Sequence, residues 1–117
     1  MKIQVNTDHN VDGSEAVVQQ VEAEVQAALE RFEDRLTRVE VHLGDESGDK
    51  GGSGADKRCL LEARPAGMQP VVVTDFAETV EDAVVGAAQK MQSLLNSTFG
   101  RIDGREADAT IRQNEQT

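Results

Sequence analysis

The sequence contains no tryptophan or tyrosine and only three phenylalanines, so a core built on large aromatic rings is excluded. Valine, leucine, alanine and methionine must supply the buried surface instead. Each of these side chains buries less apolar area than an aromatic ring does. We therefore expect a modest free energy of unfolding for the one domain that 117 residues can form.

Positive charge is also scarce, because 12 Lys and Arg stand against 22 Asp and Glu and leave a net charge of −10. Non-specific nucleic-acid binding draws most of its affinity from Lys and Arg on phosphates, so the imbalance argues against that class. It argues equally against anionic membrane surfaces. An acidic, soluble surface is the plain interpretation, and a basic partner stays open.

Disulfides, targeting signals and long apolar runs are missing as well. A single cysteine, Cys59, excludes an internal disulfide and fits a reducing compartment. The N-terminal residues alternate like a strand, and no apolar segment of a signal peptide follows them. No apolar run approaches the length of a membrane span. We expect a cytoplasmic protein with no membrane partner.

Metal-binding and catalytic spacings are absent too. The two histidines, His9 and His42, occur without C-x-x-C, H-x-x-x-H or H-E-x-x-H, so neither is expected to bind a metal with Asp8, Asp12 or Cys59. Cys59 is expected to be a small core residue. With no nucleophile and base at credible spacing, the sequence predicts no enzyme activity, no metal and no cofactor.

The glycine-rich stretch of residues 44–56 has almost nothing to bury and is predicted to be a loop. Its residues 45–49 lack the twelve-residue ligand spacing and the closing glutamate of a calcium loop. Residues 51–54 lack the Lys-Ser/Thr that follows in a phosphate-binding loop, and they open no helix.

What the sequence does contain is a clear set of periodic patterns. Alternation of apolar and polar residues predicts four strands, at residues 2–7, 36–43, 57–64 and 68–74. Apolar residues at three- and four-residue spacing predict two amphipathic helices. The first helix is capped by Ser14 and reaches Phe32, and the second runs from about Val80 to a stop at Gly100.

The element order is therefore β-α-β-β-β-α, which predicts an α+β fold with a four-stranded sheet and two helices packed on one face. Residues 1–102 form this domain in our interpretation. Residues 103–117 hold one large apolar residue, Ile111, and are predicted to be a disordered C-terminal tail.

Residues 29–43 carry a resemblance to a known family. They contain an aromatic residue followed by Asp34-Arg35-Leu36 and then Val39-x-Val41-x-Leu43. Further matching positions are Asn10-Val11, Asp82-Ala83-Val84, Lys90-Met91 and Leu95. Over about residues 2–100 the sequence resembles the ribosome hibernation-promoting factor and ribosome-associated inhibitor family.

The resemblance implies a translation regulator of the stress response that binds the small ribosomal subunit near the mRNA and tRNA sites. Family members carry rows of Lys and Arg on the two helices that face rRNA. In this sequence the first helix carries Glu22, Glu24 and Glu30 with no lysine, and the second keeps only Lys90. The partner within the ribosome is therefore either rRNA or a basic ribosomal protein.

A second hypothesis is an acidic protein-interaction module with the same fold that no longer binds the ribosome. Its acidic helix faces would dock a basic protein partner. Its exposed sheet or edge strand would support a homodimer. The helix charge favours this second hypothesis, whereas the matched segment at residues 29–43 favours the first.

Eight basic residues are predicted to contact rRNA or another partner: Arg31, Arg35, Arg38, Lys57, Arg58, Arg64, Lys90 and Arg101. Arg38 of one predicted strand shares a face with Arg58 and Arg64 of the next, which would make a small basic patch. The alternative is a set of solvated charges that pair with Glu40 and Glu62 across the strands.

Arg35 has two interpretations of its own. It is the best-matched charged position of the family resemblance, which favours a binding role. It also follows a predicted helix end, where it would hold the last carbonyls or pair with Asp34.

Overall fold

The computed structural model describes residues 1–8, 11–46 and 55–115, with the side chains of residues 105–115 excepted. His9, Asn10 and residues 47–54 lie outside the described residues. The expectations that His9 binds no metal, that Asn10 is a family position and that residues 47–54 form a loop therefore stay predictions. The loop was predicted to start at Gly44, but Gly44 and Asp45 extend the preceding strand, because they pair with Arg58 and Lys57 of the next one.

The described part of the chain forms four strands and two α-helices in the predicted order, with a 3-10 helix after the first α-helix. The elements are β1 (Lys2–Thr7), α1 (Glu15–Leu29), η1 (Glu30–Arg35), β2 (Leu36–Asp45), β3 (Lys57–Pro65), β4 (Val71–Ala77) and α2 (Val80–Glu115). The predicted α+β class is confirmed.

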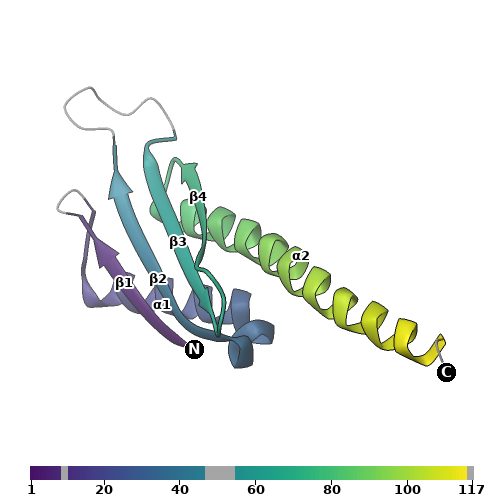
Figure 1. Cartoon of the computed structure of the whole chain (residues 1–117). Coiled ribbons are helices and arrows are strands. Elements are labelled where there is room, and N and C mark those ends of the chain that lie inside the picture. The colour runs from purple at the N-terminus through teal and green to yellow at the C-terminus, as the bar shows by residue number, and fades with distance from the viewer. Residues whose placement is uncertain (9–10, 47–54, 116–117) are drawn as a thin grey trace.

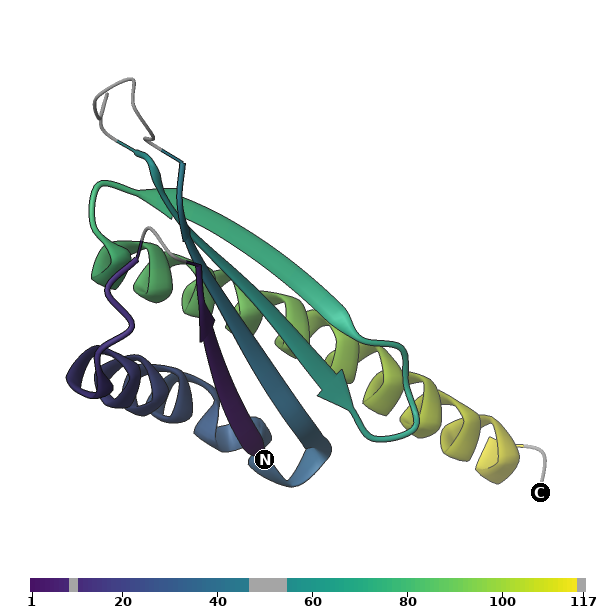
Figure 2. The ribbon, with the colours of Figure 1, turned by 90° about the vertical axis from the view of Figure 1, so that its left-hand side faces the viewer.

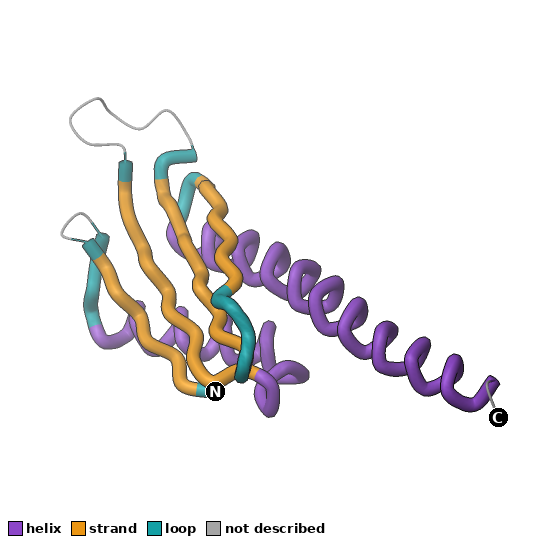
Figure 3. The backbone as a smooth tube through the Cα atoms, in the orientation of Figure 1, coloured by secondary structure: helices purple, strands orange, loops and turns teal. Residues whose placement is uncertain are grey.

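The strands form one mixed sheet in the order β1-β2-β3-β4 (Figure 1). β1 pairs with β2 in parallel, because α1 carries the chain back between them, and the other two pairings are antiparallel. Both helices lie on the same side of the sheet (Figures 2 and 3). α2 packs on β3 and β4, α1 packs on β1, and the two helices contact each other. The other face of the sheet is open.

The core lies between the sheet and the helices and is mainly aliphatic, as the scarcity of aromatic residues predicted. The alternation of β2 and β3 points one row of side chains inward: Val39, Val41, Leu43, Cys59, Leu61 and Ala63, each at most 2% exposed. Helix α2 adds Met91 and Leu95, both fully buried. Two of the three phenylalanines, Phe32 and Phe99, close one end of this core with ring centroids 5.8 Å apart.

The start of α1 agrees with the sequence. The Ser14 hydroxyl accepts a hydrogen bond from the Val17 amide at 3.4 Å, which satisfies one of the free donors of the first turn. The end of the helix differs slightly from the prediction, because the α-helix stops at Leu29 and Phe32 lies on η1.

The predicted fourth strand was placed three residues too early. β4 begins at Val71 and not at residue 68, because Pro70 has no amide hydrogen to donate to the ladder. At its other end the strand continues through Phe76 to Ala77, where the sequence had predicted the approach to the second helix.

The predicted helix stop at Gly100 is wrong, since α2 passes through this residue and continues to Glu115. Glycine costs a helix about 1 kcal/mol relative to alanine, which is too little to end a helix whose neighbouring Phe99 is buried. The domain boundary expected after residue 102 falls inside α2. The disorder expected of residues 103–117 in solution stays a prediction.

Candidate functional site

The eight predicted contact residues do not form one surface. Arg38, Arg58 and Arg64 extend from the open face of the sheet, whereas Lys57 belongs to the other row of β3 and lies at the end nearest residues 47–54. The remaining four come from η1 and α2: Arg31, Arg35, Lys90 and Arg101.

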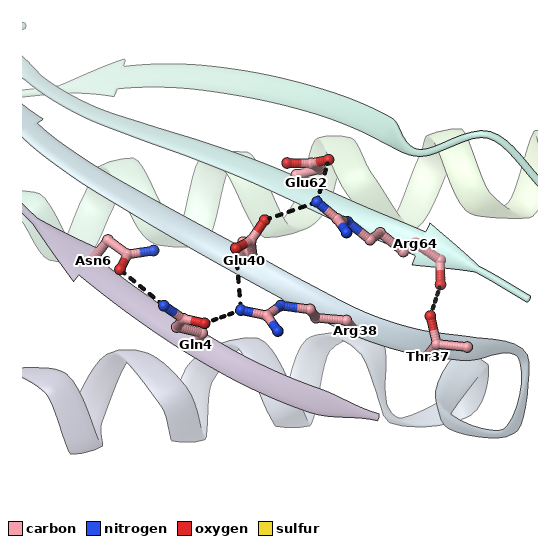
Figure 4. A network of polar contacts seen from close by, with 7 residues as sticks. All are labelled: Gln4, Asn6, Thr37, Arg38, Glu40, Glu62 and Arg64. Carbon is pink, nitrogen blue, oxygen red and sulfur yellow. Dashed lines mark hydrogen bonds and ion pairs between the residues drawn. The ribbon is translucent and has the colours of Figure 1, made fainter.

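A network of polar side chains crosses the open face of the sheet from β1 to β3 (Figure 4). The Arg38 guanidinium donates to the Gln4 side-chain oxygen and to Glu40 Oε1, the latter at 3.2 Å. Arg64 Nη2 contacts one carboxylate oxygen of Glu40 and one of Glu62, each at 3.4 Å. Both arginines are therefore engaged by carboxylates of the same sheet.

The strand register explains why this network forms. It places Arg38 directly opposite Arg64 and Glu40 directly opposite Glu62, and like charges in such positions repel. Pairing along and diagonally across the strands offsets both repulsions. The network holds two cations and two anions and presents no net positive patch. The alternative of charges paired with Glu40 and Glu62 is confirmed for Arg38 and Arg64 but not for Arg58, and a binding role for these residues stays a prediction.

The basic residues at the other end of β3 are also paired. Lys57 Nζ lies 2.9 Å from a carboxylate oxygen of Asp45, and Arg58 Nη1 lies 3.5 Å from one of Glu46. The Arg58 guanidinium lies across Gly44, where an added Cβ would come within 2.9 Å of Nη2. Gly44 is thus needed for the close approach of Arg58 to β2.

One cluster with metal-ligand chemistry was missed by the sequence reasoning. The ligand atoms of Glu40, His42 and Glu62 lie within 4.8 Å of one another on the open face. The register of β2 and β3 brings them together, which no local spacing in the sequence reveals. Because Arg38 and Arg64 already supply positive charge to both carboxylates, we assign no metal to this cluster.

The junction of η1 and α2 forms an open pocket of about 320 Å³ whose lining includes Arg31, Arg35 and Asn96. The Arg35 guanidinium lies 3.9 Å from the centroid of the Phe99 ring, and the Arg31 guanidinium lies 4.8 Å from that of Phe32. Exposed arginines beside aromatic rings and an amide are suited to phosphate and to flat polar groups. Arg101 is not among the residues that line the pocket.

Arg35 does not make the structural contacts that its position in the sequence suggested. Its Nη1 atom lies 3.2 Å from Oδ2 of Asp103 on α2, and this ion pair takes the place of the expected one with Asp34. Both partners are exposed, so the ion pair is weak and open to exchange with another anion. For Arg31, the described residues include no ion-pair partner.

Lys90 stands apart from the other predicted residues at the free edge of β4. Its Nζ atom donates to the backbone carbonyl oxygen of Thr74 at 2.9 Å and lies 2.8 Å from Oδ1 of Asp75. Lys90 therefore anchors α2 to the edge strand.

Cys59 is fully buried among the core residues of β3, as predicted. Burial raises the pKa of its thiol from 9.0 to about 12, and the negative charge of Asp75 adds to the effect. A thiol with such a pKa is a poor nucleophile at neutral pH.

In the described part of the chain, no helix combines the length and the apolar character that crossing a bilayer requires.

Comparison with known proteins gives one family and a consistent set of folds. The model of the family "Sigma 54 modulation protein / S30EA ribosomal protein" matches residues 3–103. Among curated proteins, no significant match to this sequence was found.

Two solved structures share the fold. One is the N-terminal domain of Thermus thermophilus Protein Y, with a TM-score of 0.66, 19% identity, and coverage of 84% of this chain and 99% of that one. The other is a ribosomal subunit interface protein from Coxiella burnetii, with a TM-score of 0.64, 14% identity, and coverage of 86% and 99%. At these identities the structures show the fold alone. Because the family model spans most of the sequence, the chain belongs to the Sigma 54 modulation protein / S30EA ribosomal protein family.

Proposed function

We propose that this protein is a ribosome-associated translation regulator that binds the small ribosomal subunit and holds idle ribosomes inactive. The observation that carries the proposal is the match of the family model over residues 3–103. The role is one of binding and not of catalysis, and it belongs to the cytoplasm, where ribosomes work.

The contact to RNA in this proposal is the pocket between η1 and α2. Arg31 is exposed and, among the described residues, has no carboxylate partner, while Arg35 is held by a single exposed carboxylate. A phosphate could take the place of Asp103 on Arg35 at little cost. Arg38 would have to leave Glu40 and the Gln4 side chain, and Arg64 would have to leave Glu40 and Glu62, so we assign these two arginines a smaller part.

Co-sedimentation with purified 30S subunits and 70S ribosomes, at low and at physiological salt, tests the proposal. We expect the protein in the pellet with both particles at low salt. At physiological salt the Arg31→Ala and Arg35→Ala variants should be released, because each lost phosphate contact removes affinity and reduces the salt slope by about one unit.

Arg64→Ala provides the matched control, since it removes an equally charged, exposed side chain from the neutral network on the open face. At physiological salt it should be released from the ribosome much less than the Arg31→Ala and Arg35→Ala variants are. Protein that stays in the supernatant at both salt concentrations would exclude the ribosome as a partner.

The second candidate is the acidic interaction module that keeps the fold without binding the ribosome. The charge of the helices favours it, because α1 contains three glutamates and no Lys or Arg. A negative sedimentation result would support this function, and the basic protein partner would then be sought by cross-linking in cell extract.

A further inference from the structure

An apolar groove lies between the N-terminal two-thirds of α1 and the first turns of α2, and the residues that line it all come from these two helices. It has a volume of about 150 Å³, and its floor consists of Val17, Val21, Val80 and Val84. Val21 and Val84 are buried in the core, whereas Val17 and Val80 are partly exposed. The side chains of valine are short, so two helices that meet through them leave space between their outer surfaces.

The size and lining of the groove fit one aliphatic side chain. Apolar cavities of about 150 Å³ in other proteins stay free of water and take up a small hydrocarbon such as benzene. An exposed hollow lined by valine gains free energy when an apolar group replaces the water in it.

The rim of the groove is acidic and its charge is not compensated. Glu24 of α1 and Glu81 of α2 are exposed and border the valines. Among the described residues, neither of them has an ion-pair partner.

The open face of the sheet behaves differently, since its carboxylates, such as Glu40 and Glu62, are held by arginine. No Lys or Arg occurs in α1 or in the first ten residues of α2. These two helix segments therefore carry five carboxylates, three on α1 and two on α2, with no basic residue of their own to offset them.

We propose that this groove binds a Lys- and Arg-rich protein segment that inserts one aliphatic side chain between the helices. The aliphatic group contacts the four valines, and flanking cations of the segment pair with Glu24 and Glu81. Negative potential around an apolar pocket attracts such a segment and repels RNA and anionic lipid. The proposal deepens the proposed function, on which it rests for the carrier of the segment, a basic protein of the ribosome.

The test uses the full chain with labelled valine methyl groups and a synthetic lysine-rich peptide with one central leucine. Titration should produce saturable shifts of the methyl signals of Val17, Val21, Val80 and Val84. The same peptide with serine in place of leucine should bind about tenfold more weakly, because it cannot fill the groove.

Variants of the rim separate the groove from diffuse charge attraction. Glu24→Lys combined with Glu81→Lys should lower the affinity for the leucine peptide at least about tenfold. The matched control, Glu30→Lys with Glu33→Lys, makes the same change in net charge on η1 and should weaken it by less than about threefold. The amide spectrum of each variant shows that the fold is kept.

The groove proposal is overturned if the leucine and serine peptides bind equally, if both double variants lose equal affinity, or if no peptide shifts the valine signals. If the peptide does not bind but the protein still sediments with ribosomes, the groove proposal fails and the proposed function stands. Peptide binding without ribosome sedimentation shows the groove to be functional and excludes the ribosome as the source of its partner.

Discussion

At Gly86 the helix α2 comes so close to β4 that the Asp75 carboxylate fills the space of a side chain. A Cβ atom added at Gly86 would lie 1.8 Å from Oδ2 of Asp75. The same carboxylate pairs with Lys90, one turn further along α2. This glycine therefore has a packing role that outweighs its poor helix propensity.

We expect Gly86→Ala to lower the free energy of unfolding by about 1 kcal/mol. Overpacking costs about 1–3 kcal/mol, while the better helix propensity of alanine returns about 1 kcal/mol. Urea denaturation measures the difference. Gly100→Ala is the control, because its added Cβ would meet no atom within 4 Å beyond its chain neighbours and the backbone of its own helix, and it should stabilise the protein. Stabilisation by both substitutions would contradict the close approach at Gly86.

The thiol of Cys59 makes the stability depend on alkaline pH. Its pKa is about 12 in the folded protein and 9.0 without burial, so between these values the unfolded chain loses a proton that the folded one keeps. The free energy of unfolding should fall as the pH rises above 9, by at most about 1.4 kcal/mol per unit from this group. Denaturation of the protein and of Cys59→Ala at pH 8 and pH 10.5 measures it, since the variant should lack this part of the decrease.

How far single residues could be predicted depended on the range of their contacts. The inward direction of Cys59 follows from strand alternation, and so do the pairs Arg38–Glu40 and Arg64–Glu62, whose members lie two residues apart on one strand. The pair between Arg64 and Glu40 also needs the register of β2 and β3. The partner of Arg35 is Asp103, which lies 68 positions away in the sequence, and no local pattern indicates that contact. Because the placement of α2 against η1 determines it, sequence reasoning assigned the ion pair to the neighbouring Asp34.

At the scale of the elements, the edge strand β4 is partly protected by a helix. Val72 and Phe76 on its open face are 50% and 45% exposed, which makes this strand suited to pairing with another strand. Lys90 donates to the Thr74 carbonyl between them and places a charge at the edge. The homodimer expected through the edge strand would need this contact to open.

We expect Lys90→Ala to increase self-association, because it frees the Thr74 carbonyl and removes the charge from the edge of β4. Analytical ultracentrifugation over a range of protein concentrations measures the dimer fraction. Lys90→Ala combined with Val72→Lys should return the protein to the monomer. A Lys90→Ala variant with the same dimer fraction as the unchanged protein would show that this lysine does not protect the edge.

The elements were predicted from the periodicity of apolar residues and from capping, glycine and proline residues, and the errors in their predicted bounds have physical causes. β1 and the start of α1 agree with the prediction because alternation and the Ser14 cap are local signals. β4 begins only after Pro70, which cannot donate to the ladder, and α2 continues beyond Gly100 because Phe99 is packed in the core. The groove between α1 and α2 could not be predicted, since it depends on how two helices meet, although the absence of basic residues in α1 signalled an unusual surface.

For the whole molecule, the excess of acidic groups opposes folding through mutual repulsion. Sodium chloride screens charges beyond about 10 Å at 0.1 M, so the many distant repulsions weaken more than the few close ion pairs do. We expect the free energy of unfolding to rise by about 1 kcal/mol between low salt and about 0.5 M. The Glu30→Lys and Glu33→Lys double variant has a net charge of −10 + 4 = −6, so salt should raise its free energy of unfolding by a smaller amount. A decrease with salt would mean that the close pairs dominate.

Helix α2 joins the two surfaces to which binding has been assigned. Val84 lines the groove, and Asp103 lines the pocket between η1 and α2 that contains Arg31 and Arg35. At 1.5 Å per residue these positions lie about 30 Å apart along one continuous rod. A short peptide can occupy only one of them, whereas a particle as large as a ribosome can engage both. Simultaneous engagement would make the second contact intramolecular, so two individually weak sites would give strong avidity that either one alone lacks.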